Sequence, residues 1–370
     1  MDASTITTLL NTTIAVVFTW VAYKTGQMIW KYTPYSYPNA RIRAMEARLL
    51  SDQRISELAE SRTLSNFVVN LEDTDYRERL SGLEEKGAED IERALELNLA
   101  DLQALFIKIM PKRVKGFFEL LFQEWDIRNV ANVVKAKMVG EPAIDYVVPA
   151  GLLLDKVRAM AEAKTMEEML VILEGTDYEE PLRRLLLKEI DLQEFETELY
   201  RIYYGRLLKY ALSRKGEEKL ILEEFVRLTI DAKNISTILR AKTASLSAEY
   251  IRRNLIPGGY LGEKTLEALA NTEDAAMALG ELEETRYSEV VKETREAIEK
   301  GDIGAVEKAL LRFIKRRMRE LSQFYPLSVA VALAYLLERE AEVRKLKAIA
   351  KLIEDGVPPE KIRELVGEVA

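Results

Sequence analysis

The stretch Asp126-Ile-Arg-Asn-Val-Ala-Asn-Val-Val-Lys-Ala-Lys137 returns later in the chain as Asp231-Ala-Lys-Asn-Ile-Ser-Thr-Ile-Leu-Arg-Ala-Lys242. The acid, the base two residues later, the asparagine after it and an apolar pair all fall in register. A weaker third copy begins at Glu342. The starting acids are separated by 105 residues (231 minus 126) and then by 111 (342 minus 231). A repeat of this length in a chain of 370 residues indicates three homologous modules rather than a solenoid of short repeats.

A second segment repeats with the same long period. Leu71-Glu-Asp-Thr-Asp-Tyr76 returns as Leu173-Glu-Gly-Thr-Asp-Tyr178 and again as Leu282-Glu-Glu-Thr-Arg-Tyr287. Its threonine is expected to cap the helix that follows, because a hydroxyl can accept a free backbone N–H of the first turn. A loop recurs as well, since Val148-Pro-Ala-Gly151 matches Ile256-Pro-Gly-Gly259. Each module is therefore predicted to hold a Thr-x-Tyr turn, a pair of helices and one copy of the repeated stretch.

Helical periodicity dominates the chain after residue 40, and no segment there alternates strictly as a strand would. We predict an all-α protein with three homologous helical modules at residues 33–145, 146–254 and 255–370, preceded by an apolar helix and linker at residues 1–32. Three similar units joined head to tail can close around an approximate threefold axis and leave a concave centre. Such a centre is a surface for holding a partner.

The composition excludes several kinds of chemistry. Hydrophobic residues make up 48% of the chain, enough to bury a substantial core. The chain has no cysteine, which rules out disulfides and thiol nucleophiles, and no histidine, the usual general base near neutral pH. Acidic residues outnumber basic ones by 62 to 54, so a nucleic-acid binder is not expected.

The N-terminal segment differs from the rest of the chain. Ala3 to Tyr23 holds no charged residue, and a helix of that length would span about 30 Å, the thickness of a bilayer core. We predict a membrane span, followed by basic residues that place the body on the cytoplasmic side. The alternative is an amphipathic helix that docks on the body or lies at the membrane surface. Pro34 and Pro38 predict a break between residues 31 and 39, which would form a linker.

The aligned acids Asp126, Asp231 and Glu342 are the first candidates for chemistry. If they converged on one axis, they could bind a hard cation, which prefers oxygen ligands. The simpler interpretation is that each acid lies near a helix N-terminus or pairs with the base two to four residues later. Asn129 and Asn234 are expected to bind local backbone or partner groups. We therefore predict no catalytic, cofactor-binding or metal-binding residue.

Three further stretches have a bland and a functional interpretation. Pro257-Gly-Gly-Tyr260 lacks the lysine and the preceding strand of a phosphate-binding loop, and we expect a hinge between the second and third modules. The tyrosines between Tyr200 and Tyr210 are expected to pack in the core and between modules rather than to form a ligand cage. Lys315-Arg316-Arg317 is expected to be a solvated face, with contact to an acidic partner or lipid headgroups as the alternative.

Three ordered segments carry a resemblance to a known family: Tyr37-Pro-Asn-Ala-Arg-Ile-Arg-Ala-Met45, the repeated stretch at Asp126 and Asp231, and Phe324-Tyr-Pro-Leu-Ser-Val-Ala-Val-Ala-Leu-Ala-Tyr-Leu336. They resemble the C-type stalk component of archaeal A-type and V-type ATP synthases, the counterpart of the d component in eukaryotic V-ATPases. The resemblance runs from about Tyr35 to the end of the chain. It implies a funnel-shaped, pseudo-threefold, all-helical protein in the central stalk, between the shaft subunits D and F and the membrane ring of proteolipid subunits.

The resemblance also implies a function. The function implied is that of a non-catalytic rotor subunit of a proton- or sodium-translocating rotary ATPase, a socket that couples the shaft to the proteolipid ring on the cytoplasmic side of the cell membrane, with no cofactor. Shorter family members begin near Tyr37, so the N-terminal helix departs from the pattern. Its small-residue face, with Thr5, Thr8, Thr12 and Thr19, predicts that it packs against other helices and plugs the pore of the ring. The rival hypothesis is a membrane-tethered helical scaffold that recruits soluble partners, and an enzyme is the weakest option.

Overall fold

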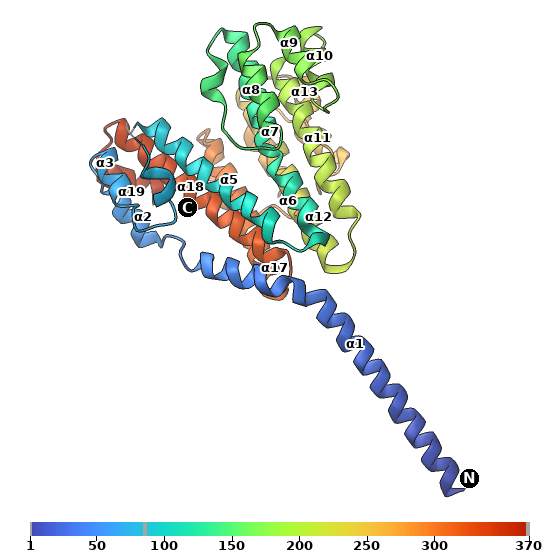
Figure 1. Cartoon of the computed structure of the whole chain (residues 1–370). Helices are drawn as coiled ribbons and strands as arrows, with labels where there is room; N and C mark the ends of the chain where they lie inside the picture. Colours follow the sequence, from blue (N-terminus) through green and yellow to red (C-terminus); the bar gives the residue numbers. More distant parts are fainter. Residues whose placement is uncertain (1, 84–86, 368–370) are drawn as a thin grey trace.

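The computed structural model describes residues 2–83 and 87–367. Within these residues every regular element is a helix, so the predicted all-α class is confirmed. The elements, labelled in Figure 1 where there is room, are α1 (Ala3–Glu46), α2 (Asp52–Ala59), α3 (Leu64–Val69), α4 (Arg77–Leu80), α5 (Ala88–Ile109), α6 (Lys112–Phe122), α7 (Glu124–Val139), the 3₁₀ helix η1 (Ala143–Tyr146), α8 (Leu154–Glu162), α9 (Met166–Ile172), α10 (Glu179–Leu186), α11 (Leu192–Leu212), α12 (Gly216–Thr243), α13 (Ala248–Arg253), α14 (Glu263–Asn271), α15 (Ala275–Gly280), α16 (Ser288–Glu299), α17 (Ile303–Phe324), α18 (Ala330–Glu354) and α19 (Pro359–Gly367).

The long helices form two arms that diverge from a common base (Figure 1). One arm holds α5 and α18, with α2, α3 and α19 at its far end, and the other holds α7, α8 and α11. Helix α17 contacts both α18 and α12 and so joins the arms. Helix α1 runs along the base and then leaves the body, which places the N-terminus far from every other element.

The first half of α18 is the centre of the core. Its residues 330–337, Ala-Val-Ala-Leu-Ala-Tyr-Leu-Leu, are all buried. A helix that is hydrophobic on every side is stable only when other helices surround it. Helices α1, α5, α12 and α17 all contact α18, and its alanines leave room for that close approach.

The two ends of the folded body share one core. Apolar side chains of α2, α3 and α5 form a separate hydrophobic cluster with those of α18 and α19. Leu58 and Phe67 are fully buried in this cluster, as are Leu346 and Ile349. Leu346 lies 288 positions after Leu58 (346 minus 58). The end of the chain therefore completes the core that its first hundred residues begin.

The threonines of the Thr-x-Tyr turns close the turn instead of capping a helix. Thr74 donates to the carbonyl oxygen of Leu71 at 2.6 Å and accepts from the N–H of Tyr76 at 3.3 Å. The same two bonds recur at Thr176 and Thr285. The residue at the N-cap of the following helix is the tyrosine, which makes no side-chain cap. The hydroxyl of each threonine thus holds the backbone that aims the tyrosine into the core.

The predicted break near residue 31 is wrong, because α1 continues through Pro34 and Pro38. A proline inside a helix removes one backbone donor and its ring crowds the preceding turn, which bends a helix without necessarily ending it. Figure 1 shows α1 changing direction where it meets the body. The two prolines therefore mark a bend and not a linker.

The body holds α1 at this bend. Arg113 donates to the carbonyl oxygen of Lys31, and the buried hydroxyl of Tyr35 donates to Glu218 Oε1 at 2.8 Å. The side-chain amide of Asn39 donates at 3.0 Å to carbonyl oxygens of the turn between α17 and α18. The segment that we expected to be flexible is thus the anchored part of the helix.

The first half of α1 projects away from the body. Phe18 is 72% exposed and Trp30 is 83% exposed, so the alternative in which this segment docks on the body is wrong. Its threonine hydroxyls donate to carbonyl oxygens one turn earlier, as Thr12 does to Thr8 at 2.8 Å. Over the residues that the structure describes, no helix combines the length and the apolar character that crossing a membrane requires. The helix is as predicted, but the membrane span is not supported, because threonines and Asn11 dilute its apolar residues.

Removing the side chain of Leu346 should weaken the core that the two chain ends share. Leu346→Ala leaves a cavity beside α2 and α3, and such substitutions cost about 2–5 kcal/mol. Urea unfolding measures the loss, and hydrogen exchange should locate it in α2 and α3 as well as in α18. Leu187→Ala is the matched control, because Leu187 is 63% exposed and its truncation should cost less than about 1 kcal/mol. Equal losses for both variants would argue against a shared core.

Candidate functional site: three carboxylate locks and a central hollow

The acids of the repeated stretch are buried. Asp126 in α7 and Asp231 in α12 are 0% exposed, and Glu342 in α18 is 7% exposed. Each lies where a distant loop crosses its helix, and each accepts hydrogen bonds from that loop. The expected pairing with a base two to four residues later is therefore wrong. We call each acid, together with the groups that donate to it, a carboxylate lock.

The first lock fixes the loop before α8. Asp126 accepts from the backbone N–H groups of Leu152 at 3.1 Å and Leu153 at 2.8 Å. Burial raises the pKa of Asp126, while these two N–H groups oppose the rise. Tyr178 is buried close by, and its burial and then the charge of Asp126 raise the pKa of its hydroxyl. One turn further on, Asn129 donates to carbonyl oxygens of the same loop at 2.8 and 3.0 Å.

The second lock repeats this arrangement before α14. Asp231 accepts from the N–H groups of Tyr260 at 2.9 Å and Leu261 at 3.2 Å. The hydroxyl of Tyr287 donates to Asp231 Oδ2 at 2.6 Å. Asn234 exchanges two hydrogen bonds of 2.8 Å with the backbone of the same loop. The asparagines of the repeat thus bind local backbone, one of the two roles that the sequence suggested.

The third lock joins the two ends of the chain. Glu342 accepts from the N–H of Leu50 at 2.5 Å and from the hydroxyl of Tyr76 at 2.6 Å. Arg339 also pairs with Glu342 at 2.7 Å, and both side chains are almost fully buried. Lys345, which replaces the asparagine, reaches a carboxylate of α2 at 3.4 Å. The acid and the loop that it holds are 292 positions apart (342 minus 50).

The hard-cation alternative receives no support from these contacts. Each of the three carboxylates already accepts from its own donors in its own lock. The described part of the chain contains no cluster of three or more acidic side chains that could hold a metal ion. The aligned acids therefore act in the fold and share no oxygen site.

Two glycines make the close approach of loop and acid possible. Gly151 has φ +111°, and a Cβ there would lie 2.2 Å from Asp126 Oδ1. A Cβ on Gly259 would lie 1.9 Å from Asp231 Oδ1. Both distances are far below van der Waals contact, so only glycine fits. In the third lock the acid is Glu342, one methylene longer, and the loop has no glycine.

The loop between the second and third modules is fixed, so the expected hinge is wrong. Arg227 donates to the carbonyl oxygens of Gly258 at 2.9 Å and Gly259 at 3.2 Å. Gly258 also packs so closely on Leu208 that a Cβ would lie 2.6 Å from Leu208 Cδ2. Together with Asp231, these contacts hold the loop on α11 and α12.

Gly259→Ala should destabilise the chain through its clash with Asp231. Overpacking a buried site costs about 1–3 kcal/mol, and here it also disturbs two hydrogen bonds. Urea unfolding of the purified chain measures this loss. Gly205→Ala is the control: Gly205 lies within α11 with open space around its Cα, so the substitution should stabilise by about 0.5–1 kcal/mol. A Gly259→Ala chain as stable as the wild type would show that the second lock does not need glycine.

A hollow region lies between the long helices. A groove of about 630 Å³ is bordered by α11, α12 and α17. One of about 230 Å³ lies between α17 and α18 and shares Glu307 with the first. Another of about 210 Å³ lies between α5, α7 and α18 and shares Arg344 with the second. We call these three adjoining grooves the central hollow.

The helical repeat explains which side chains face this hollow. Residues two positions from a lock acid are turned about 200° around the helix from it. Because the acid points toward the loop that it holds, these residues point toward the hollow. They are Glu124, Arg128, Thr229, Lys233, Glu340 and Arg344.

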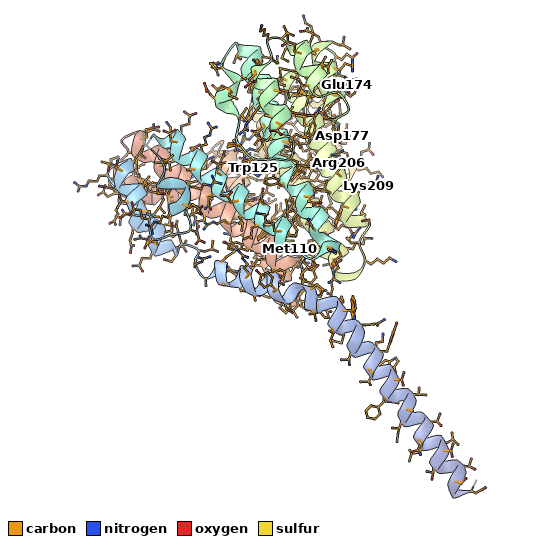
Figure 2. All side chains as sticks on the ribbon, in the orientation of Figure 1. Met110, Trp125, Glu174, Asp177, Arg206 and Lys209 are labelled. Atoms are coloured by element: carbon orange, nitrogen blue, oxygen red, sulfur yellow. The ribbon has the colours of Figure 1, made fainter. Side chains whose placement is uncertain are left out.

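Aromatic side chains form part of the same wall. On α11, Tyr203 and Tyr204 are buried, with ring centroids 4.9 Å apart, and Tyr200 stacks on Tyr204. Trp125, labelled in Figure 2 where the two arms meet, donates to Gln103 Oε1 at 2.6 Å. The tyrosines therefore pack between elements, as predicted.

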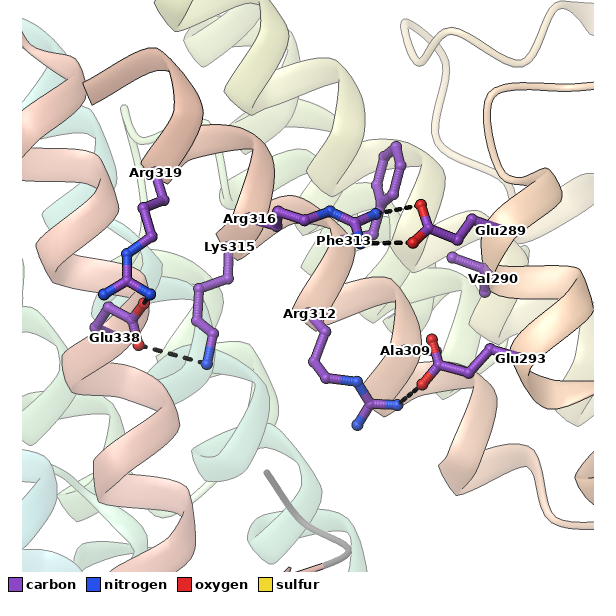
Figure 3. A pocket seen from close by; sticks show the side chains of 10 residues that line it. All are labelled: Glu289, Val290, Glu293, Ala309, Arg312, Phe313, Lys315, Arg316, Arg319 and Glu338. Atoms are coloured by element: carbon purple, nitrogen blue, oxygen red, sulfur yellow. Dashed lines mark hydrogen bonds and ion pairs between the residues drawn. The ribbon is translucent and has the colours of Figure 1, made fainter. Parts of the chain in front are cut away.

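The basic stretch Lys315-Arg316-Arg317 is neutralised within the chain. Its three side chains pair with Glu338, Glu289 and Glu224 at 3.4, 2.6 and 3.0 Å. Figure 3 shows the first two pairs across a groove of about 270 Å³ between α16, α17 and α18. The alternative in which this stretch contacts lipid headgroups or an acidic partner is not supported.

Comparison with known proteins identifies the family. The family described as ATP synthase (C/AC39) subunit matches residues 38–365. The chain belongs to this family. It is 68% identical to the C/AC39-type component of the A-type ATP synthase of Pyrococcus abyssi and 67% identical to that of Pyrococcus horikoshii, in each case over 370 residues and 100% of both chains. It is 35% identical to the corresponding protein of Methanocaldococcus jannaschii over 361 residues, which cover 95% of this chain and 89% of that protein. The resemblance inferred from the sequence is confirmed.

Sequence reasoning missed most of the lock partners of this C/AC39 family member. The Thr-x-Tyr turn and the acid both repeat, but each tyrosine lies beside the acid of another module. Tyr178 lies beside Asp126, Tyr287 beside Asp231, and Tyr76 beside Glu342. The glycine two residues after the repeated proline was a second signal, because it recurs in the same two loops that the acids hold.

Proposed function

We propose that the chain is a non-catalytic rotor subunit of a rotary A/V-type ATP synthase, a socket that couples the central shaft to the proteolipid ring. Membership of the C/AC39 family, over residues 38–365, carries this proposal. The shaft subunits D and F and the proteolipid ring are the proposed partners. The body lies on the cytoplasmic side of the membrane, and the coupling ion is a proton or a sodium ion.

The proposed architecture is a funnel of three modules, at residues 33–145, 146–254 and 255–370, around an approximate threefold axis. Recurrence of the carboxylate lock in α7, α12 and α18 supports it, because the same acid-to-loop contact occurs in three helices that all border the central hollow. The shaft enters this hollow. Its wall is broad and partly polar, as expected for a mechanical contact that depends on no single residue.

The opposite contact, with the proteolipid ring, is proposed for the base. We define the base face as the exposed apolar side chains around the point where α1 leaves the body: Trp30, Tyr37, Leu212, Leu220, Phe324 and Leu327. Phe324 is 77% exposed. The turn between α11 and α12 contacts α1 here through Glu217, which pairs with Lys31 at 2.8 Å. Met110, in the turn after α5, marks the same end of the body in Figure 2. Clustered exposed apolar residues indicate an interaction surface.

The projecting half of α1 extends the base face. The threonines that disqualify it as a lipid-spanning helix suit a helix surrounded by other helices, because small hydroxylated side chains allow close packing. Their hydroxyls are already bonded to the helix backbone, as Thr19 is to Ala15 at 2.8 Å. We therefore propose that this half enters the pore of the ring and contacts proteolipid helices.

Affinity purification of the tagged full-length chain in mild detergent tests the function. Recovery of the proteolipid ring together with D and F, and not with the tag alone, is the expected result. The alternative is a membrane-tethered scaffold, which would bring down soluble proteins without a ring. That second outcome would contradict the rotor proposal.

Phe324→Ala should weaken retention of the ring by about tenfold, because exposed aromatic residues at the centre of an interface often contribute about 1 kcal/mol or more. Recovered ring per tagged chain is the measurement, and unfolding in urea should be unchanged. Val171→Ala, at a position that is 69% exposed on α9, is the control and should retain the ring fully. Equal retention by both variants would remove Phe324 from the ring contact.

Deleting residues 2–30 should also reduce ring retention while leaving the binding of D and F unchanged, because α1 contacts the body only after that point in the helix. Retention of the ring by the shortened chain at the level of the full chain would contradict a pore-filling role for α1.

A further inference from the structure

The wall of the central hollow has acids at depth and bases at its mouth. Glu124 and Glu340 are half-buried, whereas Lys233 and Arg344 are exposed. A partner that enters the hollow therefore meets positive charge first. How strongly this charge attracts a partner depends on which of the bases the chain already pairs.

Two of the bases are left without a carboxylate. Arg128 pairs with Glu96 at 2.8 Å and also lies over the ring of Trp125. Lys233 and Arg344 occupy the corresponding positions in α12 and α18, but neither has a carboxylate oxygen within 4.0 Å in the described residues. Lys233 lies over the ring of Tyr200 at 4.4 Å. These two side chains contrast with the paired bases of the outer surface.

The two acids face each other across the hollow from α7 and α18. Burial raises the pKa of Glu124 and raises the pKa of Glu340 to about 7. The charge of Glu124 adds to the rise at Glu340, while Arg344 and Arg128 oppose it. Two carboxylates in one site resist double ionisation, because the second negative charge must form beside the first.

Every other helix around the acids also contributes a titratable group. From α12, Lys233 opposes the rise in the pKa of Glu124. From α11, Tyr203 and Tyr204 face both acids, and burial together with those acids raises the pKa of each tyrosine hydroxyl well above its usual value. These phenols stay neutral near pH 7, so only the acids change charge there.

We propose that Glu124 and Glu340 hold one proton between them and that this proton controls how tightly the central hollow binds a carboxylate-bearing end of the shaft. This inference rests on the proposed rotor function. With the proton bound, Arg344 and Lys233 are free to pair with carboxylates of the incoming partner. Once the proton is lost, two ionised glutamates compete for those bases and repel the partner.

The sign of the pH dependence follows from this arrangement. Binding that needs the protonated pair is strong below pH 7 and weakens as the pH rises through about 7. The protonated fraction of a group with a pKa of about 7 falls about tenfold between pH 6 and pH 8. Affinity for the shaft should fall by the same factor.

Calorimetric titration of the full-length chain with purified D and F subunits at pH 6, 7 and 8, at constant ionic strength, tests the proposal. The wild type should lose about tenfold in affinity across this range. Glu340→Gln, which keeps a neutral side chain at every pH, should hold the pH 6 affinity throughout. Glu299→Gln removes an exposed acid at the end of α16 and should behave as the wild type. The same pH dependence in Glu340→Gln and the wild type would overturn the proposal.

A measurement without the shaft separates this inference from the rotor function. A carboxyl whose pKa is higher in the folded chain than in the unfolded chain stabilises the fold most at low pH, and this contribution is lost as the pH rises toward about 7. Urea unfolding should therefore show that the wild type loses more stability than Glu340→Gln between pH 5 and pH 8. Equal slopes would overturn the carboxyl pair whether or not the shaft binds. A slope difference without shaft binding would keep the pair and contradict the proposed partner.

Discussion

A buried carboxylate that accepts the backbone N–H groups of a remote loop is the interaction on which this fold depends. A charge removed from water is unfavourable unless donors replace the water, and a buried N–H without an acceptor is also unfavourable. In each lock the two problems offset each other, as at Asp231 with the N–H groups of Tyr260 and Leu261. A shift of the loop by one residue would leave both sides unsatisfied. The lock therefore fixes the position at which each loop crosses its helix.

The sequence predicted what depends on local periodicity and repetition. The all-helical fold, the repeated stretch and the family all followed from spacing and from residue identity. The break in α1 failed because the proline rule describes an isolated helix, whereas contacts such as Tyr35 with Glu218 hold this one through its bend. Pairing of the acids failed for a similar reason. The donors to Asp126 lie 26 and 27 positions later, beyond the reach of any i to i+4 rule.

Charge on the outside and charge in the hollow differ in kind. Outer bases such as Arg316 and Arg317 are paired with acids of neighbouring helices, so a charged stretch in the sequence says little about binding. Lys233 and Arg344 stand alone in the sequence, and only the fold brings them to the wall of one hollow. The position of a base relative to the lock acid, two residues on, would have identified them if the orientation of that acid had been known.

The core shared by the two chain ends bears on how the chain is made. The cluster around Leu58 and Phe67 is completed by Leu346 and Ile349, and Leu346 is added 288 residues after Leu58 (346 minus 58). At a synthesis rate of roughly 5–20 residues per second, that interval is about 15–60 s. During this time the first part of the chain has left the ribosome but cannot bury its apolar side chains on their final partners. Its α2–α5 segment is thus the stretch most in need of protection from aggregation until the last helix emerges.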